Sequence, residues 1–134
     1  MNIAVSGLGA ASLRLTASAS NIANMRTRGP LPATPPSQDV PQGPGQVYQA
    51  RRVEQVANPD GGVSASLQAS LPSWRTAFDP HAPYANADGL VAEPDVDIAG
   101  EFVNMIQARA AFGASLAVIR TVNQNEKSLF DLII

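Results

Sequence analysis

Three carboxylates at alternating positions, Glu93, Asp95 and Asp97, come nearest to a chemical site in this sequence. Carboxylate oxygens are ligands that Ca²⁺ prefers, but no glycine-bearing loop of ligand spacing follows them. Helix capping explains Asp97 more simply, because an aspartate just before an apolar helical pattern accepts hydrogen bonds from free backbone N–H groups. We therefore expect no metal site.

Catalytic patterns are equally sparse. His81 is the single histidine, and it stands between Pro80 and Ala82 in a turn-like stretch, where we expect an exposed, inert side chain. The absence of cysteine excludes disulfides, thiolate metal sites and a cysteine nucleophile. No P-loop, nucleophile elbow or dinucleotide fingerprint is present. The sequence predicts a protein that is not an enzyme and needs no cofactor.

Length and composition narrow the remaining classes. The chain has 134 residues, enough for one domain, and 9 basic against 11 acidic residues, so no basic patch indicates nucleic-acid binding. No apolar run approaches the roughly 20 residues of a membrane span, so we expect no membrane insertion. The start lacks a basic n-region, which predicts that no signal peptide is cleaved.

The prolines divide the chain into three parts. All 11 lie between Pro30 and Pro94, and each proline-free end carries an apolar stripe at helical spacing. This pattern predicts a mainly α protein whose two long terminal helices form an antiparallel coiled-coil-like pair. We expect a coiled-coil helix at 1–27, a Pro/Gly-rich connector at 28–46, a small β-hairpin with irregular segments at 47–96, and a second coiled-coil helix at 97–134.

The first helix carries almost no charge. Its seam residues step by four and three, and through Met25 only Arg14 is charged. An uncharged outer face of small residues indicates a helix enclosed by protein, either by other chains or within a globular core. Asn21 and Asn24 lie one turn apart and could bond carbonyl groups or a neighbouring chain.

The middle region shows one clear strand pattern. Apolar and polar residues alternate over 63–71, and the turn-forming segment 58–62 precedes them. We therefore expect a hairpin between 47–56 and 63–71, followed by irregular turns at 79–89.

The last helix has the longest seam. Its large apolar residues step by four and three from Ile98 to Ile133, which would span about 54 Å in a helix. Asp97 is the expected N-cap, and Glu101 complements the helix dipole. Asn123 and Glu126 are polar within the seam and could fix the register between partners.

Three segments carry a family resemblance. Ser20-Asn21-Ile22-Ala23-Asn24 with Thr27 resembles the asparagine-rich signature of flagellar axial proteins. Asp79 to Asp97 and the helix segment Glu101 to Phe112 resemble the flagellar basal-body rod protein family, most of all its short proximal rod members. The chain departs from the family pattern at Arg28-Gly29-Pro30 and at Phe112-Gly113-Ala114-Ser115.

The resemblance implies a structural subunit that polymerises through its terminal helices into the torque-transmitting rod of the flagellar basal body. It implies export by the flagellar type III apparatus, a periplasmic location, and assembly with itself and other axial proteins. The expected assembly residues are Val5, Leu8, Leu15, Asn21, Ile22, Asn24, Thr27, Phe102, Met105, Ile106, Phe112, Leu116, Ile119, Phe130 and Ile133.

Two other classes share some of these features. A small coiled-coil adaptor or export-associated binding module would use the same helices, but it would form a defined dimer or hetero-complex rather than a polymer. A small hydrolase would require a pocket with a perturbed acid or base, and the sequence nominates none.

Overall fold

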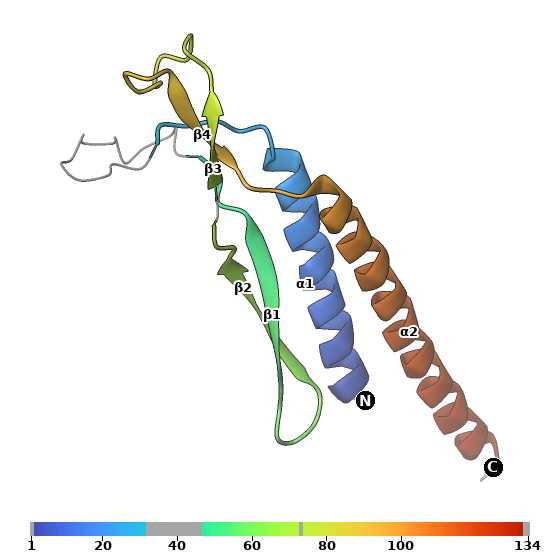
Figure 1. Ribbon diagram of the computed structural model, residues 1–134. Helices are drawn as coiled ribbons and strands as arrows, with labels where there is room; N and C mark the ends of the chain where they lie inside the picture. Colours follow the sequence, from blue (N-terminus) through green and yellow to red (C-terminus); the bar gives the residue numbers. More distant parts are fainter. Residues whose placement is uncertain (1, 32–46, 73, 133–134) are drawn as a thin grey trace.

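The computed structural model describes residues 2–31, 47–72 and 74–132. Two long helices lie side by side, the β1–β2 hairpin lies along the other side of the first helix, and a second hairpin extends beyond the C-terminal end of that helix (Figure 1). The elements in chain order are α1 (Asn2–Asn24), β1 (Arg51–Ala57), β2 (Val63–Ala69), β3 (Trp74–Phe78), β4 (Leu90–Pro94) and α2 (Ile98–Asp131). Most of the expected connector at 28–46 lies outside the described residues.

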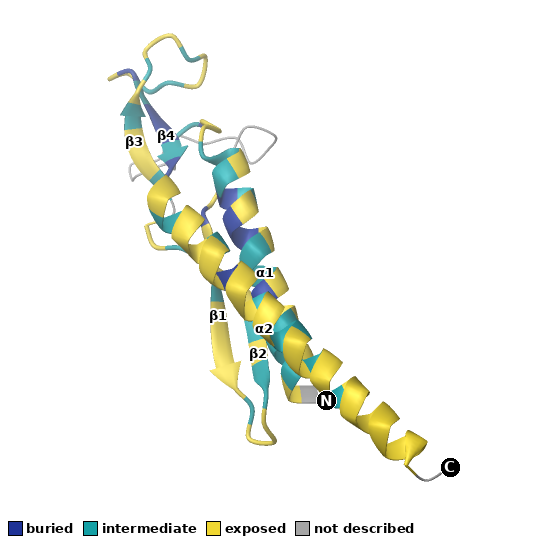
Figure 2. Cartoon of the chain, turned by 90° about the vertical axis from the view of Figure 1, so that its right-hand side faces the viewer, coloured by how far each residue is buried: buried dark blue, intermediate teal, exposed yellow. Residues whose placement is uncertain are grey.

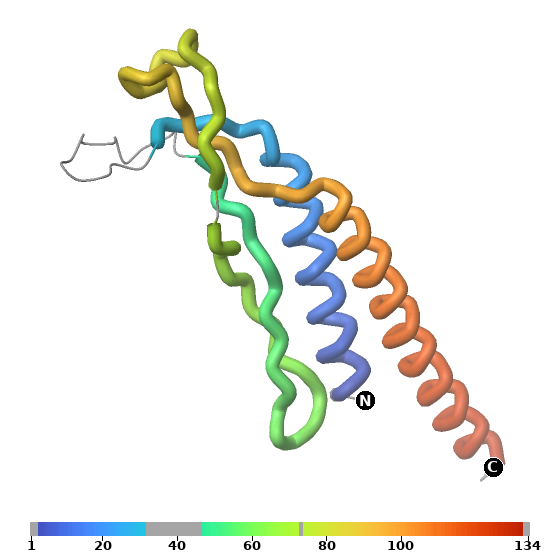
Figure 3. Tube along the Cα trace, viewed as in Figure 1, coloured from blue at the N-terminus to red at the C-terminus, as the bar shows by residue number. Residues whose placement is uncertain are grey.

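The two helices run antiparallel along their shared length. Arg14 contacts Gln107 and Asn21 contacts Glu101, so the partner's number falls as the position in α1 rises. The chain trace shows the same arrangement, with the C-terminal end of α2 reaching beyond the start of α1 (Figure 3). The lengths explain this projection, because α2 has 34 residues and α1 has 23. The predicted antiparallel helix pair is therefore present.

Helix α2 begins where the sequence predicts. The Asp97 side chain accepts a hydrogen bond of 3.1 Å from the backbone N–H of Ala99, and Glu101 lies in the first turn. An N-cap of this kind satisfies one of the four free N–H groups at a helix start.

The first hairpin is also confirmed. Strands β1 and β2 pair antiparallel from Arg51 with Ala69 to Ala57 with Val63. Gly61 and Gly62 close the turn with positive φ angles of 88° and 85°, a conformation that glycine adopts without steric cost.

The structure contains a second hairpin that the sequence pattern does not predict. Strands β3 and β4 pair antiparallel from Trp74 with Pro94 to Phe78 with Leu90, on either side of the expected turns. Each strand has only five residues, and β4 ends on a proline, so neither gives a strong alternating pattern. Gly29, just after α1, forms an additional bridge to Ala92 of β4.

The core is thin and built mainly from alanine. Figure 2 shows buried residues in a narrow band along α1 and on β4, while the surface of α2 is mostly exposed. The buried apolar residues are Ala10, Ala11, Ala17, Ala50, Val91, Ala92 and Ala108. Small side chains allow the helices to approach closely, but they leave the larger apolar groups outside.

Helix α2 is long and apolar enough to cross a membrane, judged by length and composition alone. Its most apolar 18-residue window has a mean hydropathy of 1.4, and 6% of that window is buried. Polar and charged residues such as Arg109 and Arg120 interrupt this helix, so it contains no unbroken apolar run of membrane-spanning length. The finding identifies α2 as a helix whose apolar surface is largely uncovered within the described chain.

Candidate assembly interface

The Asn21 side chain joins three elements at one point. It is 1% exposed, and its Oδ1 accepts hydrogen bonds from the backbone N–H of Arg51 and the hydroxyl of Tyr48, both at 2.9 Å. Its Nδ2 donates to the carbonyl oxygen of Arg51 at 2.7 Å and to Oε1 of Glu101 at 2.6 Å. One carboxamide thus connects α1 to the residue that opens β1 and to the first turn of α2.

This arrangement uses the full hydrogen-bonding capacity of the amide. Asparagine offers two donor hydrogens and an oxygen with two lone pairs, and each has a partner here. Burial around this cluster raises the pKa of the Tyr48 phenol, so that group stays a neutral donor. A buried polar group costs little free energy only when it is satisfied in this way, so the cluster depends on asparagine at this position.

The rest of the asparagine-rich signature shapes the end of α1. Asn24 donates from Nδ2 to the carbonyl of Ser20 at 2.9 Å, and Thr27 donates from Oγ1 to the carbonyl of Asn24 at 2.7 Å. The bond from Thr27 satisfies the Asn24 carbonyl, which has no helical partner at the C-terminus, and the bond from Asn24 adds a second donor to the carbonyl of Ser20. The expectation that the two asparagines bond carbonyl groups is confirmed.

An ion-pair cluster holds the second hairpin against the segment that follows α1. Arg28 contacts Asp79 at 2.9 Å and Glu93 at 3.1 Å, and Arg75 contacts Glu93 at 3.0 Å. The hydrogen bond from Arg75, followed by that from Arg28, lowers the pKa of Glu93 against the opposing effect of burial. Sequence reasoning missed this cluster because its members come from distant segments and carry no local pattern.

The three carboxylates considered for a metal have different surroundings. Glu93 pairs with arginines, Asp97 caps α2, and Asp95 is exposed. Among the described residues no group of three or more His, Cys, Asp or Glu side chains could hold a metal ion. His81 is exposed in the turn between β3 and β4.

The expected assembly residues that the structure describes are buried, half-buried or exposed in the isolated chain. Asn21 is buried, and Ile133 lies outside the described residues. The half-buried members are Leu8, Leu15, Ile22, Asn24, Met105, Phe112, Leu116 and Ile119, and the exposed members are Val5, Thr27, Phe102, Ile106 and Phe130.

Helix α2 presents two different apolar stripes. The stripe against α1 runs through Met105, Ala108, Phe112 and Ile119, and its members are buried or half-buried. Phe102 and Ile106 lie outside that stripe and are 53% and 69% exposed. Phe130 follows Phe112 by five helical turns, so it continues the first stripe beyond the end of α1, where it is 69% exposed. The first stripe holds the chain together, and the second has no cover within the described part of the chain.

The outward face of α1 is uncharged along most of its length. Its exposed positions again step by four and three from Val5 to Ala23. They are Val5, Gly9, Ser12, Thr16, Ala19 and Ala23. This stripe of small side chains allows another helix to approach closely.

Comparison with known proteins gives one consistent family. Residues 1–30 match the family described as Flagella basal body rod protein, and residues 87–132 match Flagellar basal body rod FlgEFG protein C-terminal. Both matched segments contain a terminal helix and the residues around it.

Several curated proteins named "Flagellar basal-body rod protein FlgC" are similar to this chain. The protein from Salmonella typhimurium is 37% identical over 128 residues, covering 90% of this chain and 86% of the relative. The Yersinia enterocolitica protein is 37% identical with 90% and 85% coverage. The Agrobacterium fabrum protein is 31% identical with 98% and 91% coverage. These relatives are rod proteins by name and not enzymes, as the sequence predicts for this chain. With this identity over nearly the whole length of both partners, the chain belongs to the FlgC family of flagellar basal-body rod proteins.

Proposed function

We propose that this protein is a structural subunit of the proximal rod of the flagellar basal body, where it assembles with other rod proteins through its terminal helices. One observation supports this proposal above all others. The long helix α2 leaves Phe102 and Ile106 exposed outside the stripe that faces α1, and Phe130 exposed where the helix projects beyond α1. A rod subunit covers such a surface with its neighbours.

The energetics favour assembly. Burying a large apolar side chain contributes roughly 1.5–3 kcal/mol, so several such residues on α2 supply a driving force that the thin alanine core cannot. The uncharged stripe on α1 places no charge where a neighbouring helix would have to desolvate it. Coiled-coil packing between subunits is the geometry that the four–three spacing of both stripes favours.

Family membership also supports a proposal about where the subunit assembles. We infer that the subunit is exported through the flagellar type III apparatus without a cleaved signal peptide and joins the rod in the periplasm. The slightly acidic balance of 9 basic and 11 acidic residues argues against nucleic acid as a partner. We assign the uncovered apolar face of α2 to protein neighbours and not to lipid, because the uncharged stripe on α1 also has the pattern of a helix–helix contact.

Charging the outer face of α2 tests the proposal. We expect Ile106→Asp to abolish incorporation into basal bodies and motility, while purified protein keeps its helical circular dichroism because the side chain is 69% exposed. Gln68→Asp, on the exposed surface of β2, adds the same charge outside the helices and serves as the control. Normal swimming by cells whose basal bodies contain the Ile106→Asp protein would contradict assembly through this face.

A further inference from the structure

Two cavities lie one after the other along α1, between the β1–β2 hairpin and α2, and we regard them as the two ends of one groove. At the N-terminal end of α1 it forms an apolar cavity of about 580 Å³. The residues that give this end its character are Ile3, Ala4, Val63, Val118, Ile119 and Val122. Gly7 lies on the floor of this end, and a Cβ there would come within 3.1 Å of Oγ of Ser115, so α1 and α2 approach closely at this point.

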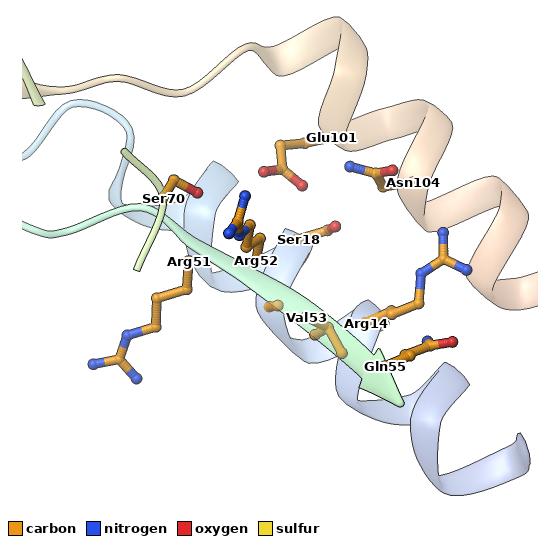
Figure 4. A pocket seen from close by; sticks show the side chains of 10 residues that line it. Arg14, Ser18, Arg51, Arg52, Val53, Gln55, Ser70, Glu101 and Asn104 are labelled. Atoms are coloured by element: carbon orange, nitrogen blue, oxygen red, sulfur yellow. The ribbon is translucent and has the colours of Figure 1, made fainter. Parts of the chain in front are cut away.

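Further along α1 the groove becomes polar and positively charged. This end is a cavity of about 480 Å³ lined by Arg14, Arg51 and Arg52, with Glu101 on the opposite wall. Figure 4 shows Arg14 and Arg52 between β1 and α2, whereas Arg51 extends away from Glu101. Within the described ranges, none of these arginines lies within 4.0 Å of a carboxylate oxygen.

The end of α2 carries the complementary pattern. Its last ten described residues, Asn123–Leu132, extend past α1, and all of them are exposed. Glu126, Leu129 and Phe130 stand at positions i, i+3 and i+4, so they share one face of the helix. This face presents a carboxylate followed, one turn later, by two large apolar side chains.

We propose that this groove receives the projecting end of α2 from a second copy of the chain, with Glu126 toward Arg14 and Leu129 and Phe130 in the apolar end. The inference rests on the proposed function, because it describes one contact between copies within the rod. It assigns a single occupant to the groove and a single acceptor to the end of α2.

Polarity supports this assignment independently of the side-chain match. Copies related by a helical operation keep one axial direction, so the incoming α2 runs parallel to the α2 that walls the groove. In that direction the incoming helix meets the arginine end first and the apolar end last. Glu126 precedes Leu129 and Phe130 in the chain, so each group reaches the end of the groove that matches it.

The spacing of the residues along the two helices is also compatible with this contact. Arg14 lies seven residues beyond Gly7, about 10 Å along α1, and Glu126 lies four residues before Phe130, about 6 Å. The flexible arginine side chain spans the remaining distance. In this alignment Asn125 of one copy lies beside Ala111 of the next, and Ala111 stands seven residues from both Asn104 and Val118 on the groove wall.

Cysteine cross-linking tests the contact directly, since the natural chain has no cysteine. Ala111 and Asn125 are about 21 Å apart in one helix, so a disulfide between Ala111→Cys and Asn125→Cys can form only between copies. We expect oxidation of isolated basal bodies to give disulfide-linked multimers of this double variant. The pair Ala117→Cys and Asn125→Cys is the matched control, because Ala117 is exposed on a different face of α2.

The charge match supplies a second readout. We expect Glu126→Arg to lower the cross-linking yield roughly tenfold, and Arg14→Glu in the same chain to restore it. Helical circular dichroism of each purified variant shows that the subunit folds.

Three outcomes would overturn the proposal. Equal yields from the two cysteine pairs would show contact without the stated register. No multimers from basal bodies that contain the Ala111/Asn125 variant would mean that the groove holds another protein's helix or the chain's own residues 32–46, and the proposed function would stand. Absence of the natural protein from basal bodies would refute the proposed function and this contact together.

Discussion

The carboxamide of Asn21 pairs with both backbone groups of Arg51, donating to the carbonyl at 2.7 Å and accepting from the N–H at 2.9 Å. These are the two bonds that a neighbouring strand would make, so a helix side chain occupies the place of a strand at the start of β1. The same amide reaches Glu101 of α2. One side chain therefore links α1, α2 and the first hairpin.

Replacing Asn21 should lower the stability of the fold far more than replacing Asn24, the other asparagine of the signature. We expect Asn21→Ala to lower the free energy of unfolding by roughly 2–4 kcal/mol, because the partners of Asn21 lose their hydrogen bonds in a part-buried site. Asn24→Ala is the control, since Asn24 bonds only the carbonyl of Ser20 within its own helix. Urea unfolding followed by circular dichroism measures both variants. Equal losses would contradict the central role of Asn21.

The sequence identified Asn21 as important, but it could not identify its partners. The one-turn spacing of Asn21 and Asn24 suggested bonds to carbonyls or to another chain, and only the three-dimensional structure shows that Arg51 and Glu101 converge there. Helices, the Asp97 cap and the first hairpin were predictable because each has a local signal within a few residues. Hydrogen bonds between residues that are 30 or 80 positions apart in the chain have no such local signal.

The tip of the first hairpin makes a close contact with α1 that permits only glycine. A Cβ at Gly62 would lie 2.6 Å from Oγ of Ser6, and the φ of 85° disfavours any side chain. We expect Gly62→Ala to destabilise the fold by about 1–3 kcal/mol. It should also break the bond of 3.1 Å from the Val63 N–H to Ser6, which amide hydrogen exchange detects.

Gly9 provides the matched control on α1. Nothing lies within 4 Å of a Cβ at this position, and the residue is exposed within the helix. We expect Gly9→Ala to stabilise the isolated subunit by roughly 0.5–1 kcal/mol, because alanine favours the helix more than glycine does. Destabilisation by Gly9→Ala would show that the α1 helix is not formed there.

Acid should release the second hairpin from the segment after α1. The pKa of Glu93 is lowered from its usual 4.5, chiefly by Arg75 and then by Arg28, so its ion pairs stabilise the fold fully above that value. This contribution is lost as the pH falls below about 4.5 and through the lowered pKa. Protection of the Gly29 and Ala92 amides, which bond each other's carbonyls, reports the change.

The Glu93→Gln variant isolates this effect. We expect its protection at Gly29 and Ala92 to be lower than that of the natural protein at pH 7, and the difference to shrink as the pH falls below 4.5 and through the lowered pKa of Glu93. A difference that stays unchanged over this fall in pH would assign the loss to packing rather than to charge.

The second hairpin shows where pattern reading fails. Its strands have five residues each, the second ends at Pro94, and an ion pair from Arg28, outside the hairpin, helps to fix its position. The exposed positions of α2 were equally hard to assign. One continuous four–three seam was expected, whereas the structure divides the apolar residues between a stripe that faces α1 and a stripe that faces outward.

The small stripe on α1 gives the last prediction. If neighbouring helices pack against it, enlarging one of its side chains should block assembly without affecting the subunit, since Ser12 and Ala19 are exposed. We expect Ala19→Trp to leave the urea unfolding of the purified protein within about 0.5 kcal/mol of the natural chain. The same variant should fail to enter basal bodies, because a large ring keeps the helices apart. Ala19→Ser, which keeps the small volume, should assemble normally. Basal bodies that contain the Ala19→Trp protein at natural levels would show that this face of α1 points toward solvent in the rod, and assembly would then depend on α2 alone.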